Sequence, residues 1–538
     1  MEVDISVKCA VIIDGGMLRI WQLKCLRLAE QNGFKIELVL SCSNTRTCRS
    51  YLTYIVYYVI NLLMMKSSLT RKHDFKEPYP SLNKIDFESE YEKSWQRLPD
   101  TVLELLRAKE IDVVIKFGMN LLKIPEGLPC QYGVISFHHG DPRSYRGRPA
   151  GFYEMLNNEA YMGIIVQRLS NVLDGGEVLS FAKSRLFDYS YSRTLQNAYR
   201  NSIPMLAQAL KNLHLNSSSS PRELGKNYRL PSNSLGLKFL RILLMRNLRR
   251  LLYGLFYEKK WQIGISEKTS AQTILDTSLR LPAQKSLEID KSYQFYADPF
   301  FLSERQIVVE GMSKRKARGE ILLVEADKQK VISSKISSQH FSYPQILSDG
   351  SRRFVFPEIS SWSNPRLYEL SAAGDILKAV DLIGLPERLV DATHVLWNGF
   401  HYIFGSLVGE AHDALRLWYS SAGMFGPYRA HPLNPIVIDP QSARMAGNLV
   451  ELDGQLYRLG QNGSRDYGNG IHLMKIQRLD ESHYKEDFVR EIKVSGAKGP
   501  HTINFSRSSM VYDWYRDDFS ILAGYRRLTD RIQKRWSN

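Results

Sequence analysis

A change of sequence texture along the chain constrains its fold most strongly. Up to residue 215, short apolar runs alternate with runs of helical periodicity, as in VKCAVIID, MLRIWQLKCLRLAEQNG and KIELVLSC. Beyond Trp261 helical periodicity almost vanishes, and short strand-like runs separated by Gly, Asp and Asn replace it. The first pattern is typical of a mainly parallel sheet covered by helices, and the second indicates a sandwich, barrel or propeller. A chain of 538 residues is too long for one core, so we predict separate domains.

The segment between the two textures is predicted to connect them. Residues 216–234 are polar and interrupted by prolines, which is typical of an exposed linker. In the following helical stretch, residues 235–261, seven basic residues accompany one acidic residue. This helix is either a connector with its arginines in water or an amphipathic helix on an anionic membrane surface. We therefore expect a first domain at 1–215, a linker and basic helix at 216–260, and a second domain at 261–538.

Composition limits the partners and the compartment of the protein. The net charge of +16 suits an anionic partner, such as a nucleic acid, a nucleotide-linked substrate or an acidic membrane. The five cysteines all lie before residue 131 and show no CxxC spacing, so we expect reduced thiols and a cytoplasmic, bacterial protein. The start of the chain lacks the pattern of a signal peptide. The apolar run at 51–65 is shorter than the roughly 20 residues of a membrane span, so we predict a buried helix.

An internal repeat defines the second domain. A polar pair precedes a strand at YADPFFL (296), FSYPQIL (341), VDATHVL (390), ARMAGNLVELDG (443) and GPHTINF (499). The spacing of roughly 45 to 57 residues predicts five blades of a propeller, whose inner strands point polar residues toward one axis. Such residues can hold sugar hydroxyls, hydrolyse a glycosidic bond as a carboxylate pair, or serve only the structure.

A second polar motif follows a predicted strand of the first domain. The run GVISFHHGD places Ser136, His138, His139 and Asp141 at a strand end, where open α/β folds bind ligands. Further along, Asp174 precedes Gly175 and Gly176, which allow a sharp turn close to a ligand. For either His138 or Asp174 alone, a structural role in a turn would be the simpler interpretation.

In order and together, these motifs resemble the folate-dependent formyltransferases. The matching features are Ser136-Phe137-His138, Tyr145-Arg146-Gly147 and Leu173-Asp174-Gly175-Gly176. The family has asparagine where this chain has Ser136. The resemblance implies a Rossmann-like α/β domain and 10-formyltetrahydrofolate as co-substrate. It also implies catalytic roles for Ser136, His138 and Asp174, cofactor contacts by Phe117, Gly118, Leu173, Gly175 and Gly176, and substrate contacts by His139, Asp141, Arg146 and Gly147.

The matching features of the second domain are WQIGI at 261, FYADPFFL, FSYPQIL with FPEIS, DATHVL and PLNPIVIDPQSARMAGNL. With them the domain is similar to five-bladed all-β propellers found beside glycosyltransferases, which are distantly related to arabinanase-like glycosidases. Those glycosidases work with carboxylates around the axis, so the resemblance implies these candidate axis residues: Asp298, Glu310, Glu358 and Asp391, with Arg444 and His501. The combination predicts N-formylation of an amino sugar, carried on a nucleotide or a lipid, in surface-polysaccharide biosynthesis. No metal site and no nucleic-acid partner are predicted, and membrane contact is expected only through residues 235–260. Two other hypotheses remain: a carbohydrate-binding protein with an inactive first domain, and a glycosidase or glycosyltransferase acting at the propeller axis.

Overall fold

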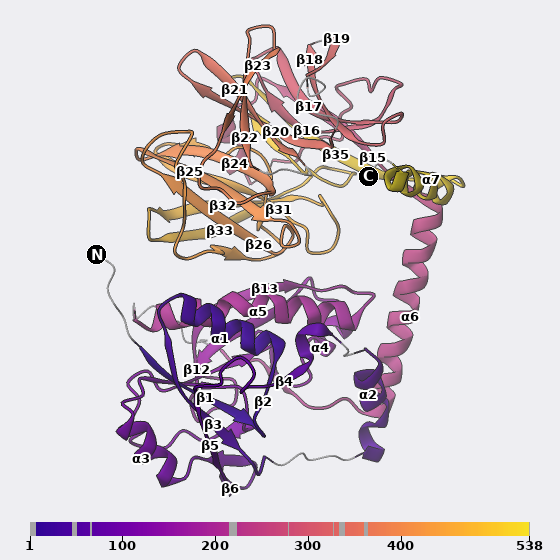
Figure 1. Cartoon of the computed structure of the whole chain (residues 1–538). Helices are drawn as coiled ribbons and strands as arrows, with labels where there is room; N and C mark the ends of the chain where they lie inside the picture. Colours follow the sequence, from indigo (N-terminus) through magenta and orange to yellow (C-terminus); the bar gives the residue numbers. More distant parts are fainter. Residues whose placement is uncertain are drawn as a thin grey trace. The chain divides into compact units, whose positions relative to one another are not determined.

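The computed structural model describes residues 7–45, 51–64, 67–214, 223–277, 279–325, 328–332, 339–359 and 364–536. The chain forms two compact units, Met1–Asn247 and Leu248–Asn538. The division falls inside one long helix, α6 (Asn233–Phe256), which Figure 1 shows as a single rod.

The first unit is built on a mixed sheet of nine strands. Five strands are mutually parallel: β5 (Asn83–Phe87), β3 (Lys35–Cys42), β1 (Lys8–Asp14), β8 (Val113–Lys116) and β10 (Val134–His138). Four strands run antiparallel to their neighbours: β2 (Met17–Arg19), β4 (Lys72–Asp74), β12 (Tyr161–Arg168) and β13 (Glu177–Arg185). The inner parallel strands β3, β1, β8 and β10 are largely apolar and buried because both faces of the sheet are covered there, whereas the edge strand β5 is polar and mostly exposed.

Helices and two small sheets complete this unit. Helix α1 (Ile20–Gln31) packs against α5 (Tyr191–His214), and α3 (Asp100–Ala108) places Val102 and Leu106 in the core of the sheet. The short helix α4 (Phe152–Leu156) precedes β12. One small sheet joins β6 (Glu90–Glu92), β7 (Trp95–Arg97) and β9 (Leu121–Leu122). The other pairs β11 (Tyr145–Gly147) with β14 (Lys226–Tyr228), so part of the predicted linker joins the first unit.

The second unit consists of five antiparallel sheets with separate core clusters. Four of the sheets follow one another along the chain, and the fifth joins the first strand of the unit to its last two. Its strands are β15 (Tyr257–Glu267), β16 (Tyr293–Phe301), β17 (Gln306–Ser313), β18 (Gly319–Glu325), β19 (Lys328–Val331), β20 (Phe341–Asp349), β21 (Arg352–Ile359), β22 (Arg366–Leu370), β23 (Ile376–Asp381), β24 (Leu389–Trp397), β25 (Phe400–Leu407), β26 (Ala414–Ser420), β27 (Arg429–Ala430), β28 (Val437–Ile438), β29 (Arg444–Met445), β30 (Val450–Leu452), β31 (Gln455–Gln461), β32 (Ile471–Leu479), β33 (Tyr484–Ile492), β34 (Ile503–Phe505) and β35 (Ser509–Phe519). Helix α7 (Ala523–Trp536) follows the last strand.

The predicted fold class, a Rossmann-like domain followed by a five-bladed propeller, is wrong. With 42% strand and 21% helix the chain is dominated by small antiparallel sheets, and the described strands show no closed propeller. The first unit is not clearly Rossmann-like, because β12 and β13 return as an antiparallel hairpin instead of through helical crossovers. Alternating apolar runs indicate strands, but strand direction depends on connections between distant segments.

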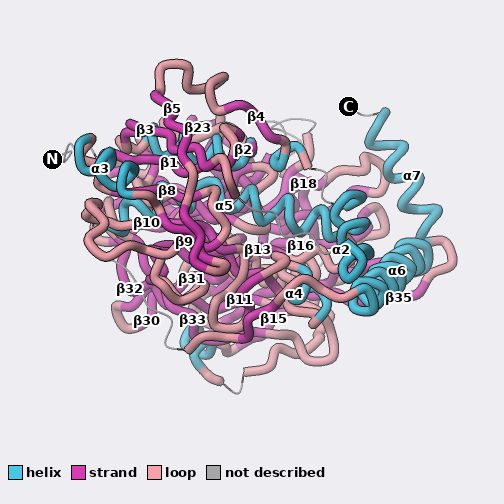
Figure 2. The backbone as a smooth tube through the Cα atoms, turned by 90° about the horizontal axis from the view of Figure 1, so that it is seen from below, coloured by secondary structure: helices cyan, strands magenta, loops and turns pink. Residues whose placement is uncertain are grey.

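The apolar run at 51–65 does form a helix, α2 (Tyr51–Met64), but the helix is not buried. Leu52, Ile55, Val59, Leu62 and Leu63 all expose more than a third of their surface. Figures 1 and 2 both show α2 beside α6, where the Asn233 side chain bonds the α2 backbone. Among the described residues, no helix combines the length and the apolar character that a membrane span requires.

Candidate ligand-binding site

Three sheets of the second unit begin with the same local distortion. In β16, β20 and β24 the pairing with the next strand shifts by one residue, which leaves Asp298, Tyr343 and Asp391 in a bulge. These residues have φ values of 49°, 44° and 47°, in the left-handed region that side chains other than glycine seldom adopt. The sequence repeat is therefore a structural repeat, and each bulge re-aims one polar side chain.

A second set of polar side chains comes from the neighbouring strands. Glu310, Glu358 and Ser406 pair with the residue before each bulge. The Glu358 Oε2 atom accepts the Asp391 N–H at 3.1 Å, and the Asp513 Oδ2 atom accepts the Asp298 N–H at 3.0 Å. Glu358 and Asp513 thus each accept a hydrogen bond from the bulge residue of a sheet other than their own.

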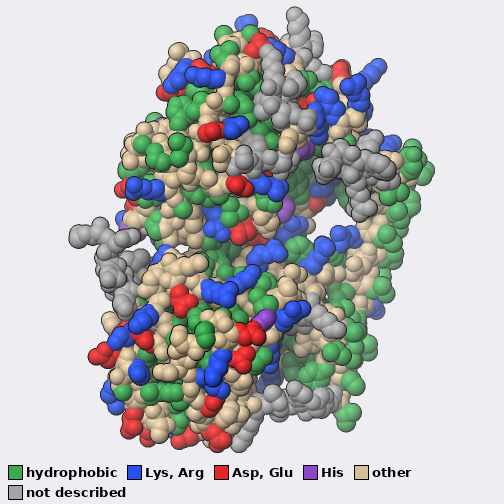
Figure 3. Space-filling model, viewed as in Figure 1, with side chains coloured by type: hydrophobic (Ala, Val, Ile, Leu, Met, Phe, Trp, Pro, Cys, Tyr) green, Lys and Arg blue, Asp and Glu red, His purple; other side chains and the backbone are tan. Residues whose placement is uncertain are grey.

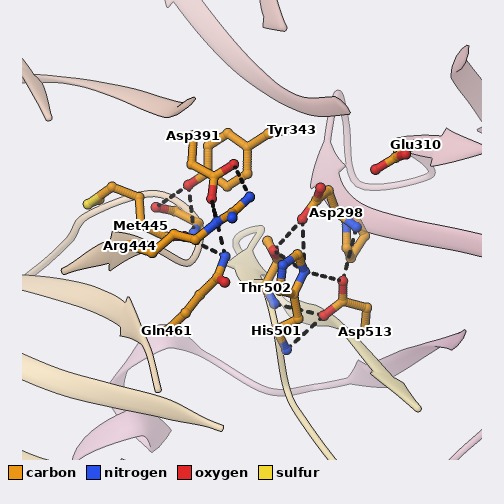
Figure 4. A network of polar contacts seen from close by, with 12 residues as sticks. Asp298, Glu310, Tyr343, Asp391, Arg444, Met445, Gln461, His501, Thr502 and Asp513 are labelled. Carbon is orange, nitrogen blue, oxygen red and sulfur yellow. Dashed lines mark hydrogen bonds and ion pairs between the residues drawn. The ribbon is translucent and has the colours of Figure 1, made fainter. Parts of the chain in front are cut away.

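The structure brings all six predicted axis residues into one network, here called the polar cluster: Asp298, Glu310, Glu358, Asp391, Arg444 and His501. Figure 4 shows its two hydrogen-bonded groups, one around Asp391 and the other around His501, with Glu310 beside Asp298. Asp298, Glu310, Asp391 and His501 are buried, whereas Glu358 and Arg444 are half-buried. Solvent therefore reaches the cluster from the side of Glu358 and Arg444.

The imidazole of His501 joins three side chains. Its Nδ1 atom lies 3.1 Å from both Asp298 Oδ1 and Asp513 Oδ2, and its Nε2 atom lies 2.6 Å from the Tyr467 hydroxyl. Burial alone would lower the pKa of His501, but Tyr467, Asp298 and Asp513 raise it well above its ordinary value. The same partnership lowers the pKa of Asp298 despite its burial. Asp298, His501 and Asp513 have the residue types of a metal site, and one ligand atom of each lies within 4.8 Å of the other two.

Asp391 forms the centre of the other group. It makes an ion pair with Arg444, whose Nη2 atom also donates to Oδ1 at 3.2 Å, and it accepts a bond from the Gln461 amide at 3.3 Å. The Arg444 guanidinium lies 5.0 Å from the centre of the Tyr467 ring, a cation–π distance. Tyr467 therefore contacts both cations of the polar cluster.

Two carboxyl groups of the polar cluster have strongly altered acidity. Burial, and then the charge of Asp298, raises the pKa of Glu310 well above its ordinary value. Burial, and then the charge of Asp391, raises the pKa of Glu358 to about 8. With a pKa of about 8, the Glu358 carboxyl group is largely protonated at neutral pH, and neither carboxyl group has a full cationic partner of its own. The His340 Nε2 atom approaches Glu310 only to 3.7 Å.

Sequence reasoning missed four residues that complete this site: Tyr343, Gln461, Tyr467 and Asp513. Tyr343 lies in the repeat motif FSYPQIL, at the same place in its unit as Asp298 and Asp391. That position could have identified Tyr343. Tyr467 lies in the loop after β31 and outside the repeat, so no sequence signal pointed to it.

In the first unit, the predicted His138 and Asp174 do meet at the end of the sheet. His138 ends β10, and its Nδ1 atom lies 3.4 Å from Asp174 Oδ1. Its Nε2 atom lies 3.0 Å from the Tyr145 carbonyl oxygen, and Asp174 Oδ2 accepts the Gly147 N–H at 2.8 Å. Both ring nitrogens therefore face protein groups, and the pair fastens the 139–147 loop.

The other predicted residues of the first unit serve neighbouring contacts. Ser136 donates to the Lys116 carbonyl oxygen, Asp141 pairs with Arg143, and Arg146 donates to the Leu173 and Gly225 carbonyls. His139 bonds Ser202 and is surrounded by aromatic rings, and its burial lowers its pKa to about 3. The glycines of the predicted site lie where an added side chain would meet a neighbouring segment. Gly118 lies against the end of β1, Gly147 against Tyr228, Gly175 against Val172 and Gly176 against Arg168. The ring of Phe117 stacks on that of Phe137.

Sequence comparison links the second unit to a plant enzyme family. The family model for the N-terminal part of glucosamine inositolphosphorylceramide transferase 1 matches residues 264–512. Proteins of that name from Oryza sativa subsp. japonica and Arabidopsis thaliana are 31% and 29% identical over 153 and 171 residues. The matches cover 27% and 31% of this chain and 20% and 22% of the relatives. The chain thus spans about a fifth of the length of the curated relatives that it matches.

Similarity to solved structures is weak. A phosphoribosylglycinamide formyltransferase from Anaplasma phagocytophilum is 15% identical, with 39% of this chain and 87% of that chain covered at a TM-score of 0.27. A family 117 glycoside hydrolase from Zobellia galactanivorans is 9% identical, with 49% and 91% covered at a TM-score of 0.31. TM-scores of this size establish neither fold nor function.

These findings overturn the predicted formyltransferase resemblance, its activity and its co-substrate. The matched relatives are transferases named for glucosamine and inositolphosphorylceramide, not for a formyl group. N-formylation with 10-formyltetrahydrofolate in polysaccharide biosynthesis is therefore wrong for this chain. The geometry supplies a physical reason, because the ring nitrogens of His138 face Tyr145 and Asp174 instead of an open position for a formyl oxygen.

Proposed function

We propose that the second unit binds an amino sugar at the polar cluster, as part of glycosyl transfer that involves a lipid-linked acceptor. The observation that carries this proposal is an imbalance of charge. With Asp513, the described cluster holds five carboxyl groups and two strong cations, Arg444 and His501, both already paired with aspartates. The two remaining carboxyl groups, Glu310 and Glu358, have raised pKa values and no paired cation of this strength.

A ligand with an ammonium group would supply the positive charge that Glu310 and Glu358 lack. A cation beside Glu310 and Glu358 would favour their charged forms, so ligand binding would release protons. Ring hydroxyls would find acceptors in the remaining carboxylate oxygens, and the half-buried Tyr467 offers an aromatic face. A phosphate group fits this site poorly because it would add negative charge to an excess of carboxyl groups.

The comparisons support a sugar as the ligand and a lipid-linked molecule as the acceptor. The relatives that match residues 264–512 carry names that combine glucosamine with inositolphosphorylceramide, a lipid-linked group. The structural alternative is that the polar cluster only ties the five sheets together. That role predicts losses of stability on substitution but no ligand.

Calorimetric titration of the full chain with glucosamine, glucose and N-acetylglucosamine tests the proposal. We expect glucosamine to bind most tightly, and binding at pH 6 to release protons, measured by comparing buffers of different ionisation enthalpy. Glu310→Gln and Glu358→Gln should each weaken glucosamine binding about tenfold or more, as expected for a charged hydrogen bond. Glu325→Gln, an exposed acid of β18, serves as the control.

Two outcomes would reject this function. Equal affinity for glucose and glucosamine would remove the role of the ammonium group. Binding of inositol phosphate without binding of glucosamine would assign the site to the acceptor headgroup instead.

A further inference from the structure

Two neighbouring helices of the first unit present apolar faces to solvent. In α2, which is kinked at Tyr54, the exposed residues after the kink, Ile55, Val59, Leu62 and Leu63, follow helical spacing and share one face. Leu52, before the kink, is also exposed. In the part of α6 that belongs to this unit, the exposed large apolar residues are Leu237, Leu244 and Met245. Further along the same helix, Leu248, Leu251 and Leu255 are exposed as well, and together these residues form a leucine stripe. Because successive residues of an α-helix are rotated by about 100°, these α6 side chains fall within an arc of about 120° around the helix axis. Leu52 is 85% exposed and Leu244 is 69% exposed.

The opposite faces of both helices hold them to the unit. Phe239 of α6 stacks on Phe152 at 4.3 Å, and Tyr57 of α2 meets the same ring edge-on. Gly236 packs against Val56, and the Arg246 guanidinium donates to the Met155 carbonyl oxygen at 2.9 Å. The exposed leucines therefore contribute little to folding, and their apolar character needs another explanation.

The charges on these helices point to the partner. Neither helix contains an acidic residue, and α6 carries Lys238, Arg241, Arg246, Arg249 and Arg250. Lys238 and Arg241 are exposed beside the leucine stripe, and Figure 3 shows blue basic groups among the green side chains along α6. An apolar stripe flanked by cations is the pattern of helices that lie in the interface of an anionic bilayer.

We propose that the exposed faces of α2 and α6, here called the α2–α6 surface, dock this protein on an anionic membrane. The surface consists of Leu52, Ile55, Val59, Leu62, Leu63, Leu237, Leu244 and Met245, with Lys238 and Arg241 beside them. The leucines enter the boundary between headgroups and acyl chains, and the basic side chains meet the lipid phosphates. This docking is independent of sugar binding at the polar cluster, although it would bring the protein to a lipid-linked substrate.

Flotation of the full chain with vesicles tests this inference. We expect binding to vesicles of phosphatidylcholine mixed with phosphatidylserine, weaker binding to phosphatidylcholine alone, and loss of the difference at high salt. The double variant Leu62→Asp, Leu244→Asp should lower partitioning into the vesicles about tenfold or more. Each substitution puts a charge where an apolar side chain would enter the bilayer. Lys238→Glu with Arg241→Glu should abolish only the preference for the anionic lipid.

Leu377→Asp is the matched control, since Leu377 is 61% exposed on β23 of the second unit. Circular dichroism and the thermal midpoint of each variant verify folding. Unchanged partitioning of the Leu62→Asp, Leu244→Asp protein would overturn the proposal. So would an absence of vesicle binding together with a dimer that this variant dissociates, because the surface would then join two copies of the chain.

Discussion

Asp298, Tyr343 and Asp391 hold a backbone conformation that costs about 1–2 kcal/mol at each residue other than glycine. Aspartate tolerates this region better than most residues, but tyrosine is bulky. The Tyr343 hydroxyl accepts the Gly447 N–H at 2.8 Å and lies 2.9 Å from the Thr393 hydroxyl. These buried hydrogen bonds offset the strain. The strained conformation thus occurs at the three bulges, each of which redirects one side chain at the place where the polar cluster forms.

Glu358 provides a residue-scale prediction about pH. Its folded pKa of about 8 lies above its ordinary value of 4.5, so between these values the folded chain holds a proton that the unfolded chain has lost. This group therefore lowers the free energy of unfolding as pH rises from 4.5 to 8. Glu358→Gln keeps an acceptor for the Asp391 N–H but does not ionise. We expect the variant to gain about 1–2 kcal/mol over the natural chain at pH 8 and nothing at pH 4.

Urea denaturation across this pH range measures the effect, and Glu325→Gln again provides the exposed control. An equal difference at pH 4 and pH 8 would show that the Glu358 carboxyl is not protonated in the folded chain.

At the scale of elements, α2 and α6 show how a local pattern can mislead. The apolar run at 51–65 predicts a helix correctly, yet burial depends on what packs against it. Of the α2 side chains whose burial is described, only Tyr57 and Ile60 are buried, and the Tyr57 ring meets Phe152 of α4, while the leucine face is exposed. The mean apolar character of a segment therefore indicates a helix but not which of its faces is covered.

Two glycines allow an element-scale prediction. Gly254 lies inside α6 with no atom within 4 Å of an added Cβ, so Gly254→Ala should raise the free energy of unfolding by about 0.5–1 kcal/mol. Gly176 precedes β13, and a Cβ there would lie 2.1 Å from the Arg168 carbonyl oxygen. Gly176→Ala should therefore destabilise the chain by about 1–3 kcal/mol. Chemical denaturation of both variants compares them, and a gain in stability for Gly176→Ala would disprove the close approach.

At the scale of the molecule, each of the described hydrophobic clusters lies within one of the two units. The cluster around Leu40 and Val114 lies wholly in the first unit, and the clusters of the second unit begin at Ile263. Separate cores imply separate cooperative transitions. The proposals follow the same division, with a membrane surface on the first unit and a sugar site in the second.

Differential scanning calorimetry tests this separation. Leu40→Ala should remove about 2–5 kcal/mol from one transition, and Leu473→Ala a similar amount from the other, since both side chains are fully buried. Each variant serves as the control for the other. A single transition that both substitutions shift together would contradict independent cores.

The sequence by itself determined the local elements and the repeat, because strand and helix periods and turn residues act over a few neighbours. The repeat, together with the propeller resemblance, selected Asp298, Glu310, Glu358, Asp391, Arg444 and His501, and the structure gathers these residues into the polar cluster. Only the tertiary structure decided strand direction, the exposed face of α2, and the engagement of both His138 nitrogens by Tyr145 and Asp174. Those features depend on contacts between segments far apart in the chain, and so do the altered pKa values of Glu310 and Glu358, which arise from burial among charges that different sheets contribute.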